Sequence, residues 1–188
     1  MEAILKRELI ANKTLCRIFG VLVFVILTAL GAFVRIPLPF SPVPLTLQTF
    51  FVLLSGACLG GPLGATSQLS YVFLGVLGLS IFTGAGSGLP YFLGPTGGYL
   101  LGFVIASFWL GRFIKYSLDN FLLTLCLFCI ADLILLSCGI IWLKFLFGYS
   151  LTKLLFIGFI PFIPGDLLKA WGATLLYLKV KSRVKEVF

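Results

Sequence analysis

The sequence predicts an all-α integral membrane protein with six transmembrane helices and short loops. Of its 188 residues, 60% are hydrophobic and only 11% are charged, so a soluble domain of this composition could not cover its surface with polar groups. Apolar runs of about 20 residues, the length that crosses a bilayer, also recur along the whole chain. These runs are residues 15–34, 45–61, 63–82, 94–114, 122–143 and 154–180. Together they nearly exhaust residues 1–188, which are therefore expected to form a single transmembrane domain without a nucleotide-binding domain.

The first run, residues 15–34, is interpreted as a helix rather than a signal peptide. It is longer than the apolar region of a signal peptide, and no small-residue cleavage site follows it. It contains Thr28, Ala29 and Ala32. Thr28 and Ala32 have the small-x-x-x-small spacing that lets another helix approach closely.

Basic residues predict the orientation of the helices. A cytoplasmic N-terminus places most of them on the inner side and few on the outer side, which the positive-inside rule favours for both termini in the cytoplasm. The inner residues are then Lys6, Arg7, Lys13, Arg17, Arg112, Lys115, Lys179, Lys181, Arg183 and Lys185, and the outer ones are Arg35, Lys144 and Lys153. The net charge of +8 is thus explained by topology and does not require nucleic-acid binding, although contact of the C-terminal tail with anionic lipid would add to it.

The predicted outer side begins with residues 35–44, in which prolines alternate with apolar residues. Such a segment is stiff, extended and not helical, so it is either a plain linker or a preformed flap over an apolar site. The second run opens beneath it with Gln48, whose side chain can both donate and accept hydrogen bonds. Gln48 is a candidate ligand contact, or it bonds a neighbouring helix.

A glycine-rich segment, residues 83–99, connects the third and fourth runs on the same predicted side. Glycine lets backbone amides approach a ligand closely, and a helix that starts at residues 94–98 would favour an anion such as a carboxylate. The alternative is a tight turn with close helix packing. The candidate binding residues here are Gly86, Ser87, Tyr91, Gly94, Thr96, Gly97, Gly98 and Tyr99.

The last run is interrupted by prolines and then carries two charges, Asp166 and Lys169. A charge in mid-membrane costs roughly 2.5 to 3.5 kcal/mol on insertion scales, and broken backbone is tolerated there only when it is buried in protein or lines a cavity. At spacing i, i+3 the two side chains share a helix face. They suit a neutral ligand with adjacent N–H and C=O groups, or they form an ion pair that only holds helices together. Asp132, in the fifth run, could pair with Lys169 or mark a partner interface.

Catalytic and metal chemistry are disfavoured because the chain contains no histidine, which removes zinc-protease motifs and Ser/His catalysis. Ser87 has glycine neighbours but no base to activate it. Cys126 and Cys129 spell C-x-x-C, yet they lie in an apolar run and are expected to be packing residues rather than a redox or metal site. The sequence predicts neither an enzyme nor a metal protein.

Three strings, residues 43–49, 93–103 and 161–170, resemble the BioY family, the biotin-binding S components of energy-coupling factor (ECF) vitamin transporters. The resemblance implies a six-helix S-component fold in the cytoplasmic membrane that binds biotin on the outer side. It also implies a membrane T component and two cytoplasmic ATPases as partners. ATP would be used only by those partners, because the chain has no Walker motif, and no cofactor is expected in this chain.

The resemblance also suggests roles for individual residues. Asp166 and Lys169 match the polar residues that the family uses for the ureido ring, which agrees with the donor and acceptor pattern of a cyclic urea. Gln48 and residues 84–98 match pocket-lining regions, where the valerate carboxylate would meet backbone amides. The small residues of the first run match the contact with the T component, although Thr28 stands where an alanine is usual.

Three alternatives remain open at the level of sequence. The protein could act as a standalone biotin facilitator, as some family members are thought to need little or no dedicated ATPase. It could serve a different small vitamin, because the sequence does not give the shape of the pocket. It could also be a non-transporting scaffold in which the charged residues lock helices or a partner.

Overall fold

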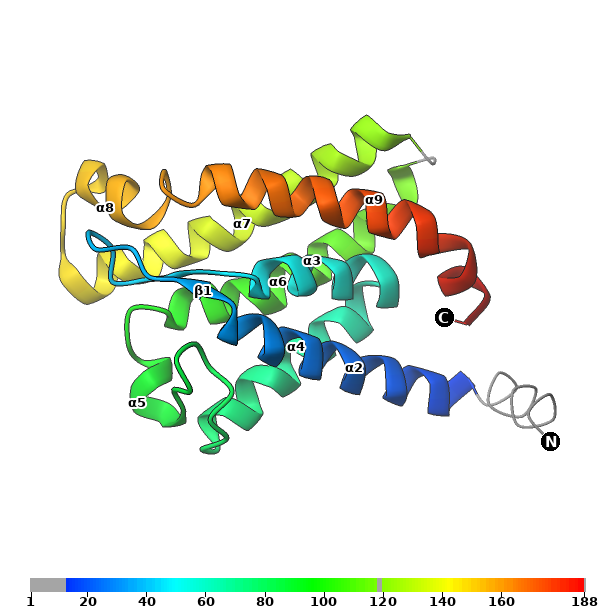
Figure 1. The fold of residues 1–188 in the computed structure, drawn as a ribbon, viewed down its shortest axis with the longest axis horizontal. Coiled ribbons are helices and arrows are strands. Elements are labelled where there is room, and N and C mark those ends of the chain that lie inside the picture. The colour runs from blue at the N-terminus through cyan, green and yellow to red at the C-terminus, as the bar shows by residue number, and fades with distance from the viewer. Residues whose placement is uncertain (1–12, 118–119, 188) are drawn as a thin grey trace.

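The computed structural model describes residues 13–117 and 120–187, which form an elongated helical bundle (Figure 1). In chain order, its elements are α2 (Lys13–Phe33), β1 (Arg35–Ile36), β2 (Leu45–Thr46), α3 (Gln48–Leu59), α4 (Gly61–Val76), α5 (Gly88–Phe92), α6 (Gly97–Phe113), the 3₁₀ helix η1 (Ile114–Ser117), α7 (Phe121–Phe147), α8 (Leu151–Gly158) and α9 (Ile163–Val187). The all-α prediction is confirmed, apart from one short antiparallel pairing of β1 with β2.

Each predicted apolar run contains a helix or, in the last run, a bent pair of helices. By length and composition, three helical stretches in the described part could cross a membrane: α2, α7, and α6 with η1. The pair of α8 and α9, bent by 51°, would be a fourth. The remaining two, α3 with 12 residues and α4 with 16, are shorter than the roughly 20 residues that span a bilayer core.

The second and third runs were predicted too long, for identifiable reasons. Leu45 belongs to β2 rather than to a helix, because the proline-rich segment before it keeps the chain extended. At the junction of α3 and α4, Gly60 adopts φ +81°, and Gly78 adopts φ +109° just after α4. Residues with side chains rarely adopt these conformations, so the turns occur at the glycines.

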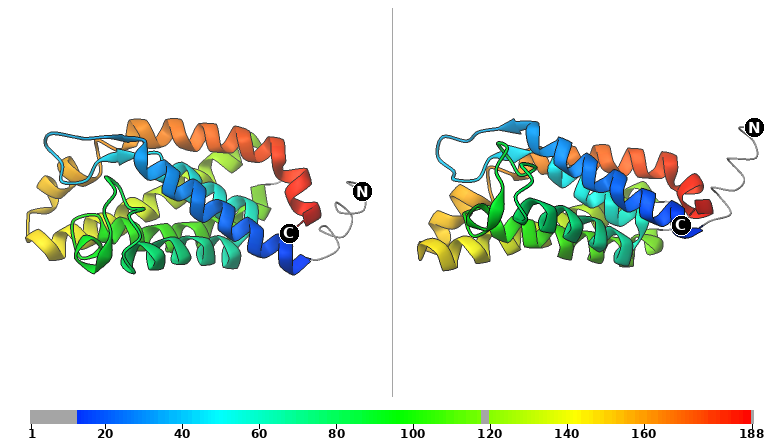
Figure 2. Two further views of the ribbon diagram at one scale, coloured as in Figure 1. Left: turned by 60° about the horizontal axis from the view of Figure 1, so that its bottom comes forward. Right: turned by 90° about the horizontal axis from the view of Figure 1, so that it is seen from below.

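The two ends of the bundle are built differently. The start of α2 and the end of α9 lie at one end, together with η1, whereas the β1–β2 hairpin, α5 and α8 lie at the other (Figures 1 and 2). This arrangement agrees with an even number of passes. Lys6 and Arg7, which contributed to the predicted orientation, lie outside the described residues.

Glycines bring α3, α4 and α6 into direct backbone contact. A Cβ atom added to Gly64 would lie 2.7 Å from the Cα of Gly56, and one added to Gly56 would overlap the backbone of Ser107. A Cβ on Gly111 would overlap the backbone at Gly60 and Gly61. Small residues permit this close approach of helices. These glycines therefore allow α3, α4 and α6 to pack closely.

The small residues of α2 point into the same interior. Thr28 and Ala32 are fully buried, and Thr28 Oγ1 donates to Gln68 Oε1 at 3.3 Å. The expectation that both residues face a partner protein is therefore not supported, because their close approach is to helices of this chain. Of the three residues, only Ala29 keeps a partly exposed side chain.

We expect Gly111→Ala to lower the thermal unfolding midpoint of the detergent-purified protein. The added methyl group meets backbone atoms that cannot rotate away, and overpacking of this kind costs about 1 to 3 kcal/mol. Gly172→Ala on α9 is the matched control, because its Cβ would come no closer than 3.6 Å to Phe50. Equal midpoints for the two variants would contradict the backbone contact between α4 and α6.

Candidate functional site

A pocket lies near the hairpin end of the bundle. Its walls come from the proline-rich segment, the glycine-rich segment, α3, α6, α7 and α9. It spans about 490 Å³ of empty space, which includes open solvent. Its polar wall residues are Thr46, Gln48, Thr49, Thr83, Thr96, Asp166 and Lys169, and its aromatic ones are Phe82, Tyr91, Tyr99, Phe103 and Phe162. The mixture of a few convergent polar groups with aromatic walls is typical of a small-molecule site.

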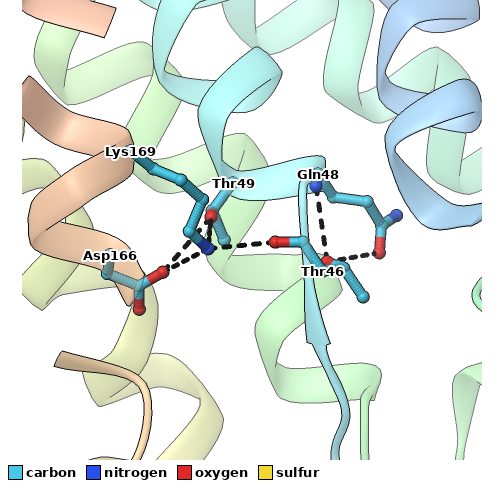
Figure 3. A network of polar contacts seen from close by, with 5 residues as sticks. All are labelled: Thr46, Gln48, Thr49, Asp166 and Lys169. Atoms are coloured by element: carbon cyan, nitrogen blue, oxygen red, sulfur yellow. Dashed lines mark hydrogen bonds and ion pairs between the residues drawn. The ribbon is translucent and has the colours of Figure 1, made fainter. Parts of the chain in front are cut away.

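Among these polar residues, Asp166 and Lys169 form an ion pair, with exposed side-chain fractions of only 3% and 11%. Lys169 Nζ also donates to the carbonyl oxygen of Thr46 at 3.0 Å and to Thr49 Oγ1 at 2.5 Å. Thr49 Oγ1 in turn lies 3.4 Å from Asp166 Oδ1, to which it donates (Figure 3). The buried ammonium is thus surrounded by acceptors from β2, α3 and α9.

The second oxygen of the Asp166 carboxylate, Oδ2, is buried without a hydrogen-bond partner. A buried carboxylate oxygen that lacks a partner is costly. The side chain of Asp132 lies beside the Asp166 carboxylate, and Asp166 also lines the pocket.

The broken last run places these side chains, as predicted. Between α8 and α9 the helix is interrupted around Pro161, and the Asp166 N–H donates to the Phe162 carbonyl at 2.9 Å as α9 begins. Asp166 therefore lies in the first turn of α9. Thr46 and Thr49 complete the site but were not among the predicted site residues; their position on either side of Gln48 was the available signal.

Gln48 is 4% exposed and connects the two loops that meet over the pocket. Its Oε1 accepts from Thr46 Oγ1 at 3.2 Å and from Thr83 Oγ1 at 2.8 Å, and its Nε2 donates to Tyr71 Oη at 2.6 Å. Tyr71 Oη then donates to the Ile81 carbonyl at 2.9 Å. Gln48 thus lines the pocket and also bonds a neighbouring helix, so the two interpretations of this residue are compatible. Sequence reasoning missed Tyr71, which looks like one more aromatic residue of an apolar run.

In the glycine-rich segment, the structure brings Tyr91 to the pocket wall but not Gly86 or Ser87. The Tyr91 ring stacks on Phe82 with centroids 5.1 Å apart, and its hydroxyl donates to the Thr83 carbonyl at 3.0 Å. A Cβ atom on Gly86 would overlap the Tyr91 ring. Gly86 therefore makes room for an aromatic wall residue rather than for a ligand.

At the start of α6, the structure brings Thr96 and Tyr99 to the pocket wall but not Gly97 or Gly98. A Cβ on Gly98 would lie 2.7 Å from the Cys138 carbonyl oxygen and would overlap Trp142. These glycines therefore serve the close packing of α6 on α7.

The backbone amides at this helix start are also largely engaged. The Gly97 amide donates to the Gly94 carbonyl at 3.1 Å, and the Tyr99 and Leu100 amides donate to the Thr96 carbonyl. Gly94 also accepts from Trp142 Nε1 at 2.9 Å through its carbonyl. Within the described residues, the Thr96 and Gly98 amides are not among these donors, so the expected contact of a ligand carboxylate with this helix start stays a prediction.

Asp132 fulfils neither of the roles considered for it. Its side chain is 6% exposed, which leaves little surface for a partner, and the ion pair of Lys169 in the described residues is with Asp166. Its Oδ1 atom is buried without a partner. Asp132 and Asp166 both line a second cleft between α7 and α9, so Asp132 lies beside the site without lining the main pocket.

Within the described residues, no cluster of three or more histidine, cysteine, aspartate or glutamate side chains could hold a metal ion. Cys126 and Cys129 are both free thiols, and Cys126 is exposed on the outside of the bundle. The site thus offers hydrogen-bond donors, acceptors and one ion pair rather than a metal or nucleophile.

Comparison with known proteins agrees with this arrangement. The chain is 40% identical over 158 residues to a probable biotin transporter BioY of Pyrococcus horikoshii, a match that covers 83% of this chain and 90% of that protein. It is 36% identical over 160 residues to the biotin transporter BioY of Thermotoga maritima, which covers 85% and 92%. These relatives are transporters rather than enzymes.

A solved structure resembles the fold as a whole. The crystal structure of the S-component for biotin from an ECF-type ABC transporter superposes with a TM-score of 0.84 at 26% sequence identity, over 91% of this chain and 93% of that one. The sequence profile of the BioY family matches residues 6–186. The chain therefore belongs to the BioY family.

Proposed function

We propose that this protein binds biotin in the pocket at the hairpin end and takes it up as the substrate-specific S component of an ECF-type transporter. The observation that carries the proposal is the buried Asp166–Lys169 pair in the wall of a pocket that combines further polar side chains with aromatic ones. Membership of the BioY family and the names of the relatives support biotin as the ligand.

The ureido ring of biotin has two N–H donors on either side of one carbonyl, and the site offers matching groups. Asp166 Oδ2 would accept from a ring N–H, which satisfies an oxygen that otherwise lacks a partner. Lys169 Nζ would donate to the ring carbonyl in place of one of its present acceptors, the Thr46 carbonyl or Thr49 Oγ1. The rings of Phe82, Tyr91 and Tyr99 would pack against the apolar thioether ring and side chain.

We further propose that residues 1–188 form one substrate-binding domain that works with a membrane T component and two cytoplasmic ATPases. Energy from ATP would come only through those subunits, which is typical of the family. On α2, Ala29 remains accessible to the T component, together with the exposed apolar residues around it. Standalone uptake differs from this proposal only in the energy source, and reconstitution with and without the partners would distinguish the two.

The scaffold alternative has one observation in its favour. The Asp166–Lys169 pair joins α9 to β2 and α3 through Thr46 and Thr49, which is what a purely structural ion pair would do. The variants below separate that role from ligand binding.

Calorimetric titration of the detergent-purified, ligand-stripped protein tests the ligand directly. We expect saturable, stoichiometric binding of biotin and no binding of thiamine. Desthiobiotin should bind more weakly than biotin, because it lacks the sulfur atom that would pack against the apolar wall of the pocket. Binding of thiamine but not biotin by folded protein would move the assignment to another vitamin. A folded protein that binds none of the three would favour the scaffold.

We expect Asp166→Asn and Lys169→Met each to lower biotin affinity by about 10- to 150-fold, because hydrogen bonds to charged groups are each worth about 1.5 to 3 kcal/mol. Lys115→Met is the control, since this lysine is exposed at the other end of the bundle and does not line the pocket. It should bind biotin as the parent protein does. Loss of membrane insertion or folding in both pocket variants would instead support a structural role for the pair.

We also propose that both termini face the cytoplasm and that the pocket opens on the outer side of the cytoplasmic membrane. A C-terminal fusion to green fluorescent protein should then fluoresce, whereas a C-terminal fusion to alkaline phosphatase should be inactive. Alkaline phosphatase inserted after Gly148, in the turn between α7 and α8 at the hairpin end, should be active. The reverse pattern would place the pocket on the cytoplasmic side and would contradict uptake from outside.

A further inference from the structure

The mouth of the pocket forms a second cavity of about 630 Å³, including its open space. Pro44, Thr83, Tyr91 and Thr96 line both this cavity and the inner pocket. The two spaces are therefore adjoining parts of one site. A ligand held by its head at Asp166 could extend its other end into the mouth.

Arg35 is the charged residue among those that line the mouth. It belongs to β1, where it pairs with Thr46 of β2, so its backbone is fixed beside the polar network of the inner pocket. Within the described part of the chain, no ion pair or hydrogen bond engages its guanidinium group. A cation at the mouth of the pocket is thus available to an anionic group.

The guanidinium group of Arg35 lies against the glycine-rich loop. Gly84 has φ +76°, and a Cβ atom added to it would overlap Arg35 Nη1. The guanidinium therefore lies against the loop backbone, while the residue as a whole is exposed. Its place depends on both loops that cover the pocket.

Other groups that could neutralise a carboxylate near the pocket are already engaged. Lys169 is paired with Asp166, and the amides of Gly97, Tyr99 and Leu100 at the start of α6 donate to carbonyls within the chain. Arginine binds a carboxylate through two parallel N–H groups, which makes it a strong and directional partner. Among the charged residues that line the pocket and its mouth, Arg35 is thus the favoured anion-binding group.

We propose that Arg35 binds the carboxylate of a ligand whose neutral ring lies at Asp166 and Lys169. This assigns the ligand class of the site: a cyclic group with N–H donors and a carbonyl, joined by an apolar chain to a carboxylate. The inference rests on the proposed function, since biotin has both ends, and it identifies a residue that selects the acid over its neutral derivatives.

The test compares biotin with biotin methyl ester, which keeps the ring and the chain but lacks the charge. The parent protein should bind biotin at least about 10-fold more tightly than the ester. In Arg35→Gln, affinity for biotin should fall about 10-fold while affinity for the ester stays unchanged, so that the preference disappears. Arg112→Gln, an exposed arginine at the other end of α6, is the matched control and should keep the preference. Raising the salt concentration should weaken binding of biotin more than binding of the ester.

Two outcomes would overturn the inference while leaving the proposed function intact. One is equal affinity of the parent protein for biotin and the ester, a comparison that needs no variant and therefore does not depend on the folding of one. The other is a preference for biotin that survives Arg35→Gln in a variant with an unchanged unfolding midpoint. Failure of the folded parent protein to bind either compound would instead refute biotin binding itself.

Discussion

The ion pair of Asp166 and Lys169 is the constraint on which the arrangement of the hairpin end depends. Two charges buried in an apolar bundle are stable only when their remaining hydrogen-bonding capacity is met. The Thr46 carbonyl and the Thr49 hydroxyl meet it for Lys169, which requires β2 and the first turn of α3 to lie against α9. Elements more than 100 residues apart in sequence are thereby fixed around one point. Asp166 Oδ2 has no hydrogen-bond donor, and the Asp132 side chain lies beside the same carboxylate.

Gln48 extends this constraint to the loops. Its amide oxygen receives hydrogen bonds from both loop segments through Thr46 and Thr83, and its amide nitrogen reaches Tyr71. The proline-rich hairpin and the glycine-rich loop are consequently coupled through one buried side chain at the pocket wall. A ligand that displaces any of these bonds would act on both loops together. This coupling gives a physical route by which an occupied pocket could differ in loop conformation from an empty one.

The glycines divide into groups with different physical roles. Gly56, Gly64 and Gly111 allow helix backbones to touch, Gly98 accommodates Trp142, and Gly86 accommodates the ring of Tyr91. Their abundance in the glycine-rich segment suggested that backbone amides approach a ligand there. A missing Cβ, however, is equally required wherever a bulky side chain or another backbone lies close, and sequence does not reveal which neighbour that is.

The sequence by itself determined the membrane-embedded, all-helical class, the break in the last run and the choice of Asp166, Lys169 and Gln48 as candidate site residues, because each follows from composition or from the cost of placing a polar group in an apolar run. It also contained the motifs that identify the BioY family. Only the tertiary structure decided that Thr46, Thr49 and Tyr71 complete the polar network, that Thr28 and Ala32 pack inward, and that Asp132 lies beside the site. The reason is that hydrogen-bond partners and helix faces are set by contacts between segments distant in sequence, which local patterns of residues do not encode.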